Sequence, residues 1–135
     1  MIHQKDLRLG DLVQITVDLP EYKQGDTFVV IDISEIYIGL RSPSESDCRP
    51  DMYTVRVHIE GIHLTPEILE KNGWEQEYYA PIIYGHIGHD IEISFLQTSK
   101  RCSVLLNDIS LCEIQYVHEL QHILWALGKD ANLKI

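Results

Sequence analysis

Three short stretches with strand character follow one another closely near the start of the chain. Leu12 to Asp18 alternates between apolar and polar residues, Thr27 to Ile33 is β-branched and more continuously apolar, and Glu35 to Leu40 alternates again. A period of two is typical of a strand with one buried face. Strands this short and this close together predict a curled antiparallel sheet.

A tight turn, Leu9-Gly10-Asp11, leads directly into the first of these strands. Many SH3-like small barrels begin in this way, so by analogy we expect residues 1–50 to form a β-rich, SH3-like part. The polar, proline-bounded stretch Ser42 to Pro50 is best explained as an exposed loop or a boundary. The expected fold class is α+β: an SH3-like small β-barrel, followed in residues 51–135 by an antiparallel sheet with a short helix and a C-terminal packing helix.

Further strands are predicted beyond the boundary. Met52 to Glu60 alternates strongly, and we expect the even-numbered residues from Met52 to Glu60 to face water. Trp74 to Ile83 and Ile91 to Gln97 predict two more strands, and Cys102 to Cys112 predicts a hairpin that turns at Asn107-Asp108. The C-terminal helix is expected over residues 115–127.

A short helix is predicted between Thr65 and Gly73. Thr65 can accept a hydrogen bond from the free N–H groups at the helix start, and Pro66 fits the first turn, where no donor is missed. Glu67 meets the positive end of the helix dipole, and Gly73 can adopt the left-handed conformation that ends a helix.

The charge balance disfavours nucleic-acid binding. The net charge is -10, the acidic excess is spread along the chain, and the longest basic run is Lys100-Arg101. A phosphate-binding surface needs clustered Lys and Arg. The chain shows neither the apolar run of a signal peptide nor a stretch long enough to span a membrane, so we expect a cytoplasmic protein with free thiols at Cys48, Cys102 and Cys112.

The predicted C-terminal helix contains His118-Glu119-Leu120-Gln121-His122, which matches the H-E-x-x-H signature of zinc hydrolases. Two histidines four residues apart can share a zinc ion, and the Glu can act as a general base on zinc-bound water. A catalytic zinc also needs a third protein ligand, and only Asp130 of the usual ligand types follows His122. A structural, amphipathic helix is the preferred interpretation, and a zinc site is the alternative.

A helical projection places the apolar residues of this helix on one side and His118 and His122 on the other. It therefore predicts that both histidines turn away from the buried side. Trp125 also falls off the apolar stripe, and we expect it to pack under a neighbouring segment rather than form a partner-binding surface.

Two further groups of metal-ligand residue types occur. Tyr84 to Asp90 includes His86, His89 and Asp90, but its two glycines favour a turn before the next strand. A zinc site that joins Cys102 and Cys112 to the two helix histidines is disfavoured. If the hairpin loop has two residues, Cys102 pairs with Glu113, and the two thiols point to opposite faces of the sheet.

Three segments carry a resemblance to a known family. They are Leu7-Arg-Leu-Gly-Asp-Leu-Val13, Gly61-Ile-His-Leu-Thr-Pro-Glu-Ile-Leu-Glu-Lys-Asn-Gly-Trp74 and Tyr116-Val-His-Glu-Leu-Gln-His-Ile-Leu-Trp-Ala-Leu127. They resemble, in the same order, segments of a family of small uncharacterised Bacteroidetes proteins that are often associated with phage or mobile elements. The family usually has other residues at the positions of Glu119 and His122, and tends to have Pro at that of His63. The resemblance therefore implies that H-E-x-x-H is incidental here, and it implies no mechanism.

These observations together predict a non-enzymatic accessory protein that acts by binding another protein or by self-association. No nucleotide-binding glycine loop, dinucleotide fingerprint or G-x-S-x-G elbow occurs in the chain. The alternative is a zinc-dependent hydrolase with His118 and His122 as ligands and Glu119 as the base.

Overall fold

The computed structural model describes residues 6–44, 50–78, 80–96 and 99–135. It divides the chain into two compact units, Met1–Ile62 and His63–Ile135. Residues 51–62, which the sequence assigned to the second part, belong to the first unit because their strands pair with the first sheet. Residues 45–49 of the predicted loop, including Cys48, lie outside the described residues.

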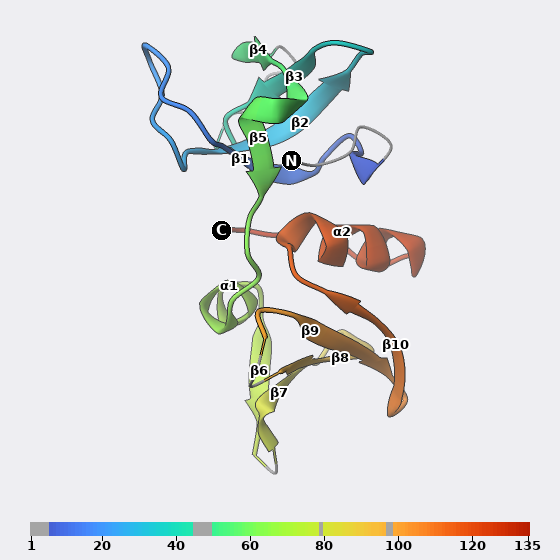
Figure 1. Ribbon diagram of the computed structural model, residues 1–135. Helices are drawn as coiled ribbons and strands as arrows, with labels where there is room; N and C mark the ends of the chain where they lie inside the picture. The colour runs from blue at the N-terminus through green and yellow to red at the C-terminus, as the bar shows by residue number, and fades with distance from the viewer. Residues whose placement is uncertain (1–5, 45–49, 79, 97–98) are drawn as a thin grey trace. The chain divides into compact units, whose positions relative to one another are not determined.

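The first unit contains one five-stranded antiparallel sheet (Figure 1). In sheet order its strands are β4 (Met52–Thr54), β3 (Ile38–Arg41), β2 (Thr27–Ile33), β1 (Leu12–Ile15) and β5 (Ile59–Gly61). The three predicted strands near the start are confirmed: β2 has the predicted bounds, β1 ends earlier than expected, and β3 starts later and ends one residue later. β4 and β5 form the two edges, and within the described residues no pairing between them closes the sheet, so the predicted barrel is not confirmed.

The core of this unit is formed by apolar residues from the sheet and the segment before it: Leu7, Val13, Ile15, Phe28, Val30, Ile38, Leu40 and Ile59. Their spacing of two along β1, β2 and β3 is the alternation that the sequence displays.

The prediction of one strand from Met52 to Glu60 is wrong. A 3-10 turn, Arg56–His58, separates β4 from β5. Thr54, which was expected to face water, is 7% exposed, whereas Val57 on the supposed inner face is 59% exposed. A 3-10 helix repeats every three residues, whereas a strand repeats every two. The alternation of residue types from Met52 to Glu60 therefore does not show which side chains are buried.

The second unit contains another five-stranded antiparallel sheet and two helices, which makes the fold α+β. The strands run in sequence order across the sheet: β6 (Trp74–Glu77), β7 (Ala80–His86), β8 (His89–Phe95), β9 (Cys102–Leu106) and β10 (Ile109–Ile114). The single predicted strand from Trp74 to Ile83 is in fact two strands that pair with each other. One sheet face is apolar and buried, with Tyr84, Ile91, Ile93, Cys102 and Val104 each at most 4% exposed.

Helix α1 (Pro66–Lys71) confirms the predicted start and end signals of this helix. The Thr65 side chain accepts a hydrogen bond from the Ile68 N–H at 3.3 Å, and Gly73 has a φ of +85°. Helix α2 (Val117–Ala126) lies within the predicted range 115–127 and buries Val117, Leu120 and Leu124. Among the described residues no helix is both long enough and apolar enough to cross a membrane.

The hairpin between β9 and β10 turns at the predicted residues. Asn107 and Asp108 have φ values of 51° and 65°, as a two-residue type I′ turn requires. The predicted register fails beyond the turn because a bulge at Leu111 shifts the pairing by one residue. Cys112 therefore pairs with Val104 instead of Ser103.

Candidate functional site

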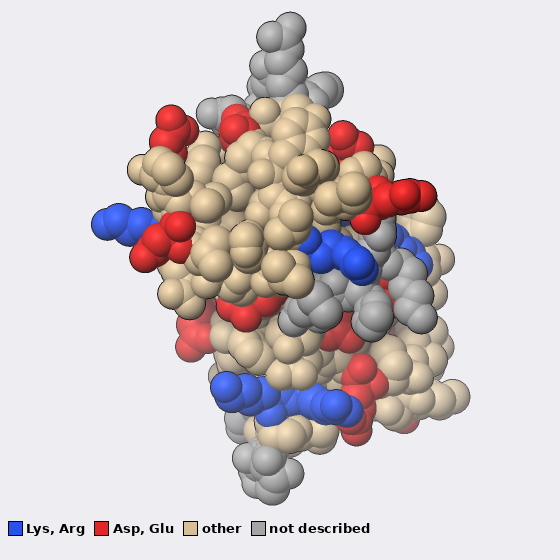
Figure 2. Space-filling view, turned by 45° about the horizontal axis from the view of Figure 1, so that its top comes forward, with Lys and Arg blue, Asp and Glu red and all other residues tan. Residues whose placement is uncertain are grey.

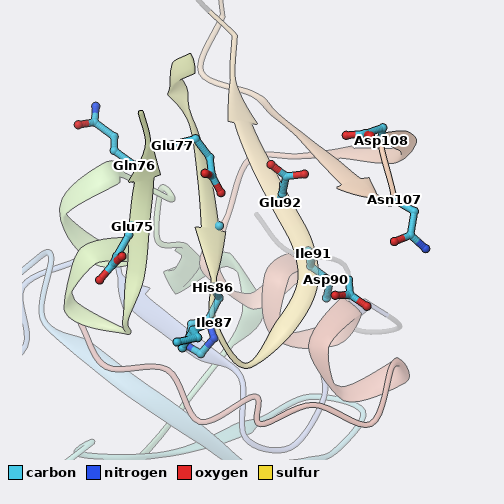
Figure 3. A pocket seen from close by; sticks show the side chains of 11 residues that line it. Glu75, Gln76, Glu77, His86, Ile87, Asp90, Ile91, Glu92, Asn107 and Asp108 are labelled. Atoms are coloured by element: carbon cyan, nitrogen blue, oxygen red, sulfur yellow. The ribbon is translucent and has the colours of Figure 1, made fainter. Parts of the chain in front are cut away.

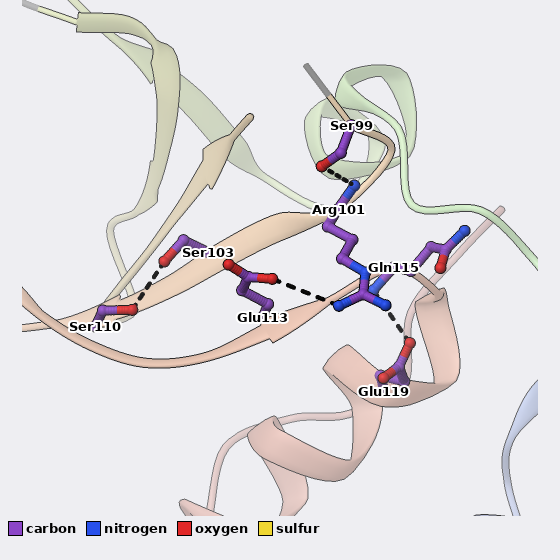
Figure 4. A network of polar contacts seen from close by, with 7 residues as sticks. All are labelled: Ser99, Arg101, Ser103, Ser110, Glu113, Gln115 and Glu119. Carbon is purple, nitrogen blue, oxygen red and sulfur yellow. Dashed lines mark hydrogen bonds and ion pairs between the residues drawn. The ribbon is translucent and has the colours of Figure 1, made fainter. Parts of the chain in front are cut away.

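Glu119 of the H-E-x-x-H string is engaged at the start of α2. Its carboxylate atom Oε1 accepts a hydrogen bond from the backbone N–H group of Gln115 at 3.1 Å (Figure 4). The same atom accepts a second hydrogen bond from the backbone N–H group of Tyr116, also at 3.1 Å. Those groups have no partner within the helix, and a carboxylate there also lies at the positive end of the helix dipole. The presence of a Glu between the two histidines is therefore explained by its role at the helix start, without a metal.

The two histidines lie in a row of rings along one side of α2. The Tyr116 and His118 rings are stacked, with centroids 5.7 Å apart and planes inclined at 13°, and the His118 and His122 centroids are also 5.7 Å apart. His63 adds a fourth ring, 5.1 Å from Tyr116. Among the described residues, no group of three His, Cys, Asp or Glu side chains is placed to hold a metal ion.

The prediction that both histidines turn away from the buried side is wrong for His118, which is only 5% exposed. Gln121, on the same flank of the helix, is 6% exposed. The helix thus buries a polar flank besides its apolar stripe, and a projection based on apolar residues cannot detect it. Trp125, which was expected to be packed, is 69% exposed.

The segment with His86 forms a hairpin turn between β7 and β8, which confirms the glycine-turn interpretation. The Gly88 N–H donates a hydrogen bond to His86 Nδ1 at 2.9 Å, so the imidazole holds the turn closed. The side chain of His89 lies outside what the structure describes.

The two described cysteines are free thiols whose surroundings oppose ionisation. Burial raises the pKa of Cys102 to about 11. The pKa of Cys112 is raised by partial burial and then by the negative charge of Glu119. Because the thiolate is the form that binds metals and attacks electrophiles, neither thiol is activated for that chemistry.

The sequence did not anticipate a hollow on the second sheet that is lined by acidic side chains (Figure 3). It has a volume of about 520 Å³. Five of its lining residues are Asp or Glu: Glu75, Glu77, Asp90, Glu92 and Asp108. Among the described residues that line it there is no Lys or Arg. A hollow lined by charges of one sign concentrates the electric field and attracts groups of the opposite charge.

The strand register explains how these carboxylates gather. Gly85 of β7 pairs with Glu75 on one side and with Glu92 on the other. A Cβ atom at Gly85 would collide with the carboxylate of Glu77, which lies across this position. Figure 3 shows the Glu77 side chain extending over β7 and the Glu92 side chain on the neighbouring strand β8. The missing side chain of Gly85 thus leaves the space that three Glu residues surround.

The wider surface is acidic as well. On the face drawn in Figure 2, Asp and Glu side chains are spread widely, and Lys and Arg side chains occur in small separate groups. This distribution agrees with the net charge of -10.

Comparison with known proteins adds no relatives. No family model matches this chain, and the searches of curated proteins and of solved structures found no matching protein.

Proposed function

We propose that this is a non-enzymatic interaction protein whose second unit binds a positively charged segment of another protein. The acidic hollow is the observation that supports this proposal. Glu75, Glu77 and Glu92 lie on paired strands, so the strand register gathers their negative charges in one place before a partner arrives. Lys or Arg side chains of a partner would be attracted into the hollow and would gain speed and selectivity of association from it.

A different protein is a better partner for this hollow than a second copy of the chain. Each copy carries a net charge of -10 and the same acidic hollow. Two such surfaces brought face to face would repel each other, and charged groups of like sign cost affinity at an interface. Self-association would therefore have to use another surface.

The alternative of a zinc-dependent hydrolase has weaker support. Its base, Glu119, would first have to give up two backbone hydrogen bonds that hold the start of α2. The direct test is the metal content of protein purified without a histidine tag. A zinc-to-protein ratio near one that falls to zero in a His118→Ala variant would favour the hydrolase over our proposal.

We also propose an architecture for the first unit, and a family origin and cellular location for the protein. The strand order β4-β3-β2-β1-β5, with a 3-10 turn before the last strand, supports an opened SH3-like barrel in the first unit. Membership of the Bacteroidetes family with phage or mobile-element association, and a cytoplasmic location, are proposed from the sequence segments and composition alone.

The proposal is tested by selecting binders from a random peptide display library with the intact chain as bait. Selected peptides should be rich in Lys and Arg, and their binding should weaken as salt is raised. The double variant Glu75→Gln/Glu92→Gln should bind them about tenfold or more weakly, since two charge contacts are lost. Its matched control, Glu21→Gln/Glu35→Gln, removes the same charge from exposed positions of the first unit and should bind normally.

Two results would contradict the proposal. One is a set of selected peptides without basic residues. The other is an equal loss of binding in both double variants, because this would show that only the net charge matters.

A further inference from the structure

The last seven residues of the second unit, 129–135, form an irregular segment held against the rest of the unit, which we call the strap. Asn72, at the end of α1, pairs with the backbone of Lys134 through two hydrogen bonds. The Lys134 N–H donates to Asn72 Oδ1 at 2.7 Å, and Asn72 Nδ2 donates to the Lys134 carbonyl at 2.7 Å. A side-chain amide thus binds both polar groups of one backbone residue, as a neighbouring strand would.

A second amide side chain holds the strap three residues earlier. Gln121 of α2 donates from Nε2 to the Ala131 carbonyl at 3.2 Å, and Gln121 is only 6% exposed. Both amides contact backbone atoms of the strap, so they would hold another peptide of different sequence in the same way. Gly128, with a φ of +70°, connects α2 to the strap.

The strap does not fill the space that it covers. A hollow of about 230 Å³ lies between strap residues, including Leu133, and the body of the unit. Its other walls include Trp74, His86 and Leu124, and the Trp74 and His86 rings meet edge to face at 5.5 Å. Aromatic and aliphatic walls of this kind suit an apolar side chain larger than leucine.

We propose that this groove is a docking site for an extended peptide segment of a partner protein, and that the strap occupies it as an internal ligand. The partner's backbone takes the place of residues 131–134 on Gln121 and Asn72. A bulky aromatic side chain of the partner takes the place of Leu133 and fills the hollow. Backbone hydrogen bonds supply affinity and the side-chain pocket supplies selectivity, as in other modes of extended-peptide recognition.

The strap sets a threshold for this binding. Because it is tethered, it competes at an effective concentration in the millimolar range. A partner segment must therefore bind better than the strap, and an aromatic residue in the underfilled hollow provides the means. This site is distinct from the acidic hollow and does not depend on the function proposed for it.

The test uses the full chain and a fluorescent peptide of the strap sequence with Phe in place of Leu133, followed by anisotropy. In the protein, Lys134→Pro removes the N–H that donates to Asn72, so the strap is weakened and the peptide should bind several-fold more tightly than to the wild type. A control peptide with Pro at the position of Lys134 should bind about three- to tenfold more weakly than the Phe peptide, because it lacks one hydrogen bond. Asn72→Ala in the Lys134→Pro protein should weaken the Phe peptide about tenfold or more.

Several results would overturn the proposal. They are no saturable binding to the Lys134→Pro protein up to about 1 mM peptide, equal binding of the Phe and control peptides, and no effect of Asn72→Ala. The comparison of the two peptides uses one protein, so it remains decisive even if the Asn72→Ala variant folds poorly. A dimer that the Phe peptide dissociates would assign the groove to the strap of a second copy instead of a partner.

Discussion

Replacing Glu119 by Ala should destabilise the second unit, because the carboxylate holds the start of α2. Its Oε1 atom accepts the N–H groups of Gln115 and Tyr116, each at 3.1 Å. In the variant these two donors lose their acceptor, and the helix also loses a negative charge at its positive end.

The expected loss can be estimated from the two hydrogen bonds. A capping side chain at a helix start contributes about 0.5 to 2 kcal/mol, and hydrogen bonds to charged groups lie at the upper end of the usual range. Glu119 is only partly buried, so water can reach the freed N–H groups and reduce the loss. We therefore expect the free energy of unfolding to fall by about 1 to 2 kcal/mol, and the urea midpoint to fall by roughly 0.5 to 1 M.

Tryptophan fluorescence during urea unfolding is a suitable assay, because both tryptophans of the chain, Trp74 and Trp125, belong to the second unit. The signal is therefore specific for the unit that contains the mutation. Glu113→Ala is a matched control: it removes a carboxylate whose salt bridge to Arg101, at 3.7 Å, joins two exposed side chains. An exposed pair of this kind contributes at most about 1 kcal/mol and often nothing measurable.

A capping role of Glu119 is refuted if the free energy of unfolding of Glu119→Ala lies within about 0.3 kcal/mol of that of the wild type. The carboxylate would then be free for another role, and the zinc-hydrolase interpretation would regain strength. A destabilisation seen only when zinc is present would also contradict a capping role, because the two hydrogen bonds need no metal.

Three further outcomes can be checked on the same protein. Burial raises the pKa of Cys102 to about 11, above the ordinary 9.0, so the unfolded thiol ionises first as pH rises and up to about 2 to 3 kcal/mol of stability should be lost between pH 9 and 11. The loss should be clearly smaller in Cys102→Ala, where only the raised pKa of Cys112 still contributes to it. Gly39→Ala should cost about 1 to 3 kcal/mol in thermal unfolding, because its Cβ would lie 2.8 Å from the Asp32 Cβ, and Asp32→Gly should restore part of the loss. Trp125→Ser should change stability by under about 0.5 kcal/mol and leave only the emission of buried Trp74, which acrylamide should quench poorly.

The elements that the sequence predicted well are those with local signals. The cap at Thr65 and the glycine at Gly73 fix both ends of α1, since each acts on its own neighbours along the chain. The Asn107-Asp108 turn is also local, because both residues adopt positive φ angles more readily than most. In each case the signal and the structure that it determines lie within a few residues.

The features that the sequence missed depend on partners far along the chain. The acidic hollow exists only because β6, β7 and β8 pair in one register that places Gly85 between Glu75 and Glu92. The bulge at Leu111 changes which residue Cys112 faces, and no composition signal marks it. The burial of His118 reflects a polar flank of α2 that an apolar pattern cannot reveal.

The acidic hollow contains two local features that disfavour folding, and this supports its role in binding. The backbone freedom of a glycine costs the interior of a strand such as β7 about 0.5 to 1 kcal/mol, and like charges gathered across strands are destabilising. Such violations of local rules are expected mainly at functional sites. If the carboxylates serve binding rather than folding, Glu75→Gln/Glu92→Gln should lose basic peptides and yet be at least as stable as the wild type. A destabilised double variant would instead mean that the carboxylates stabilise the fold, and their gathering in the hollow would no longer support a binding function.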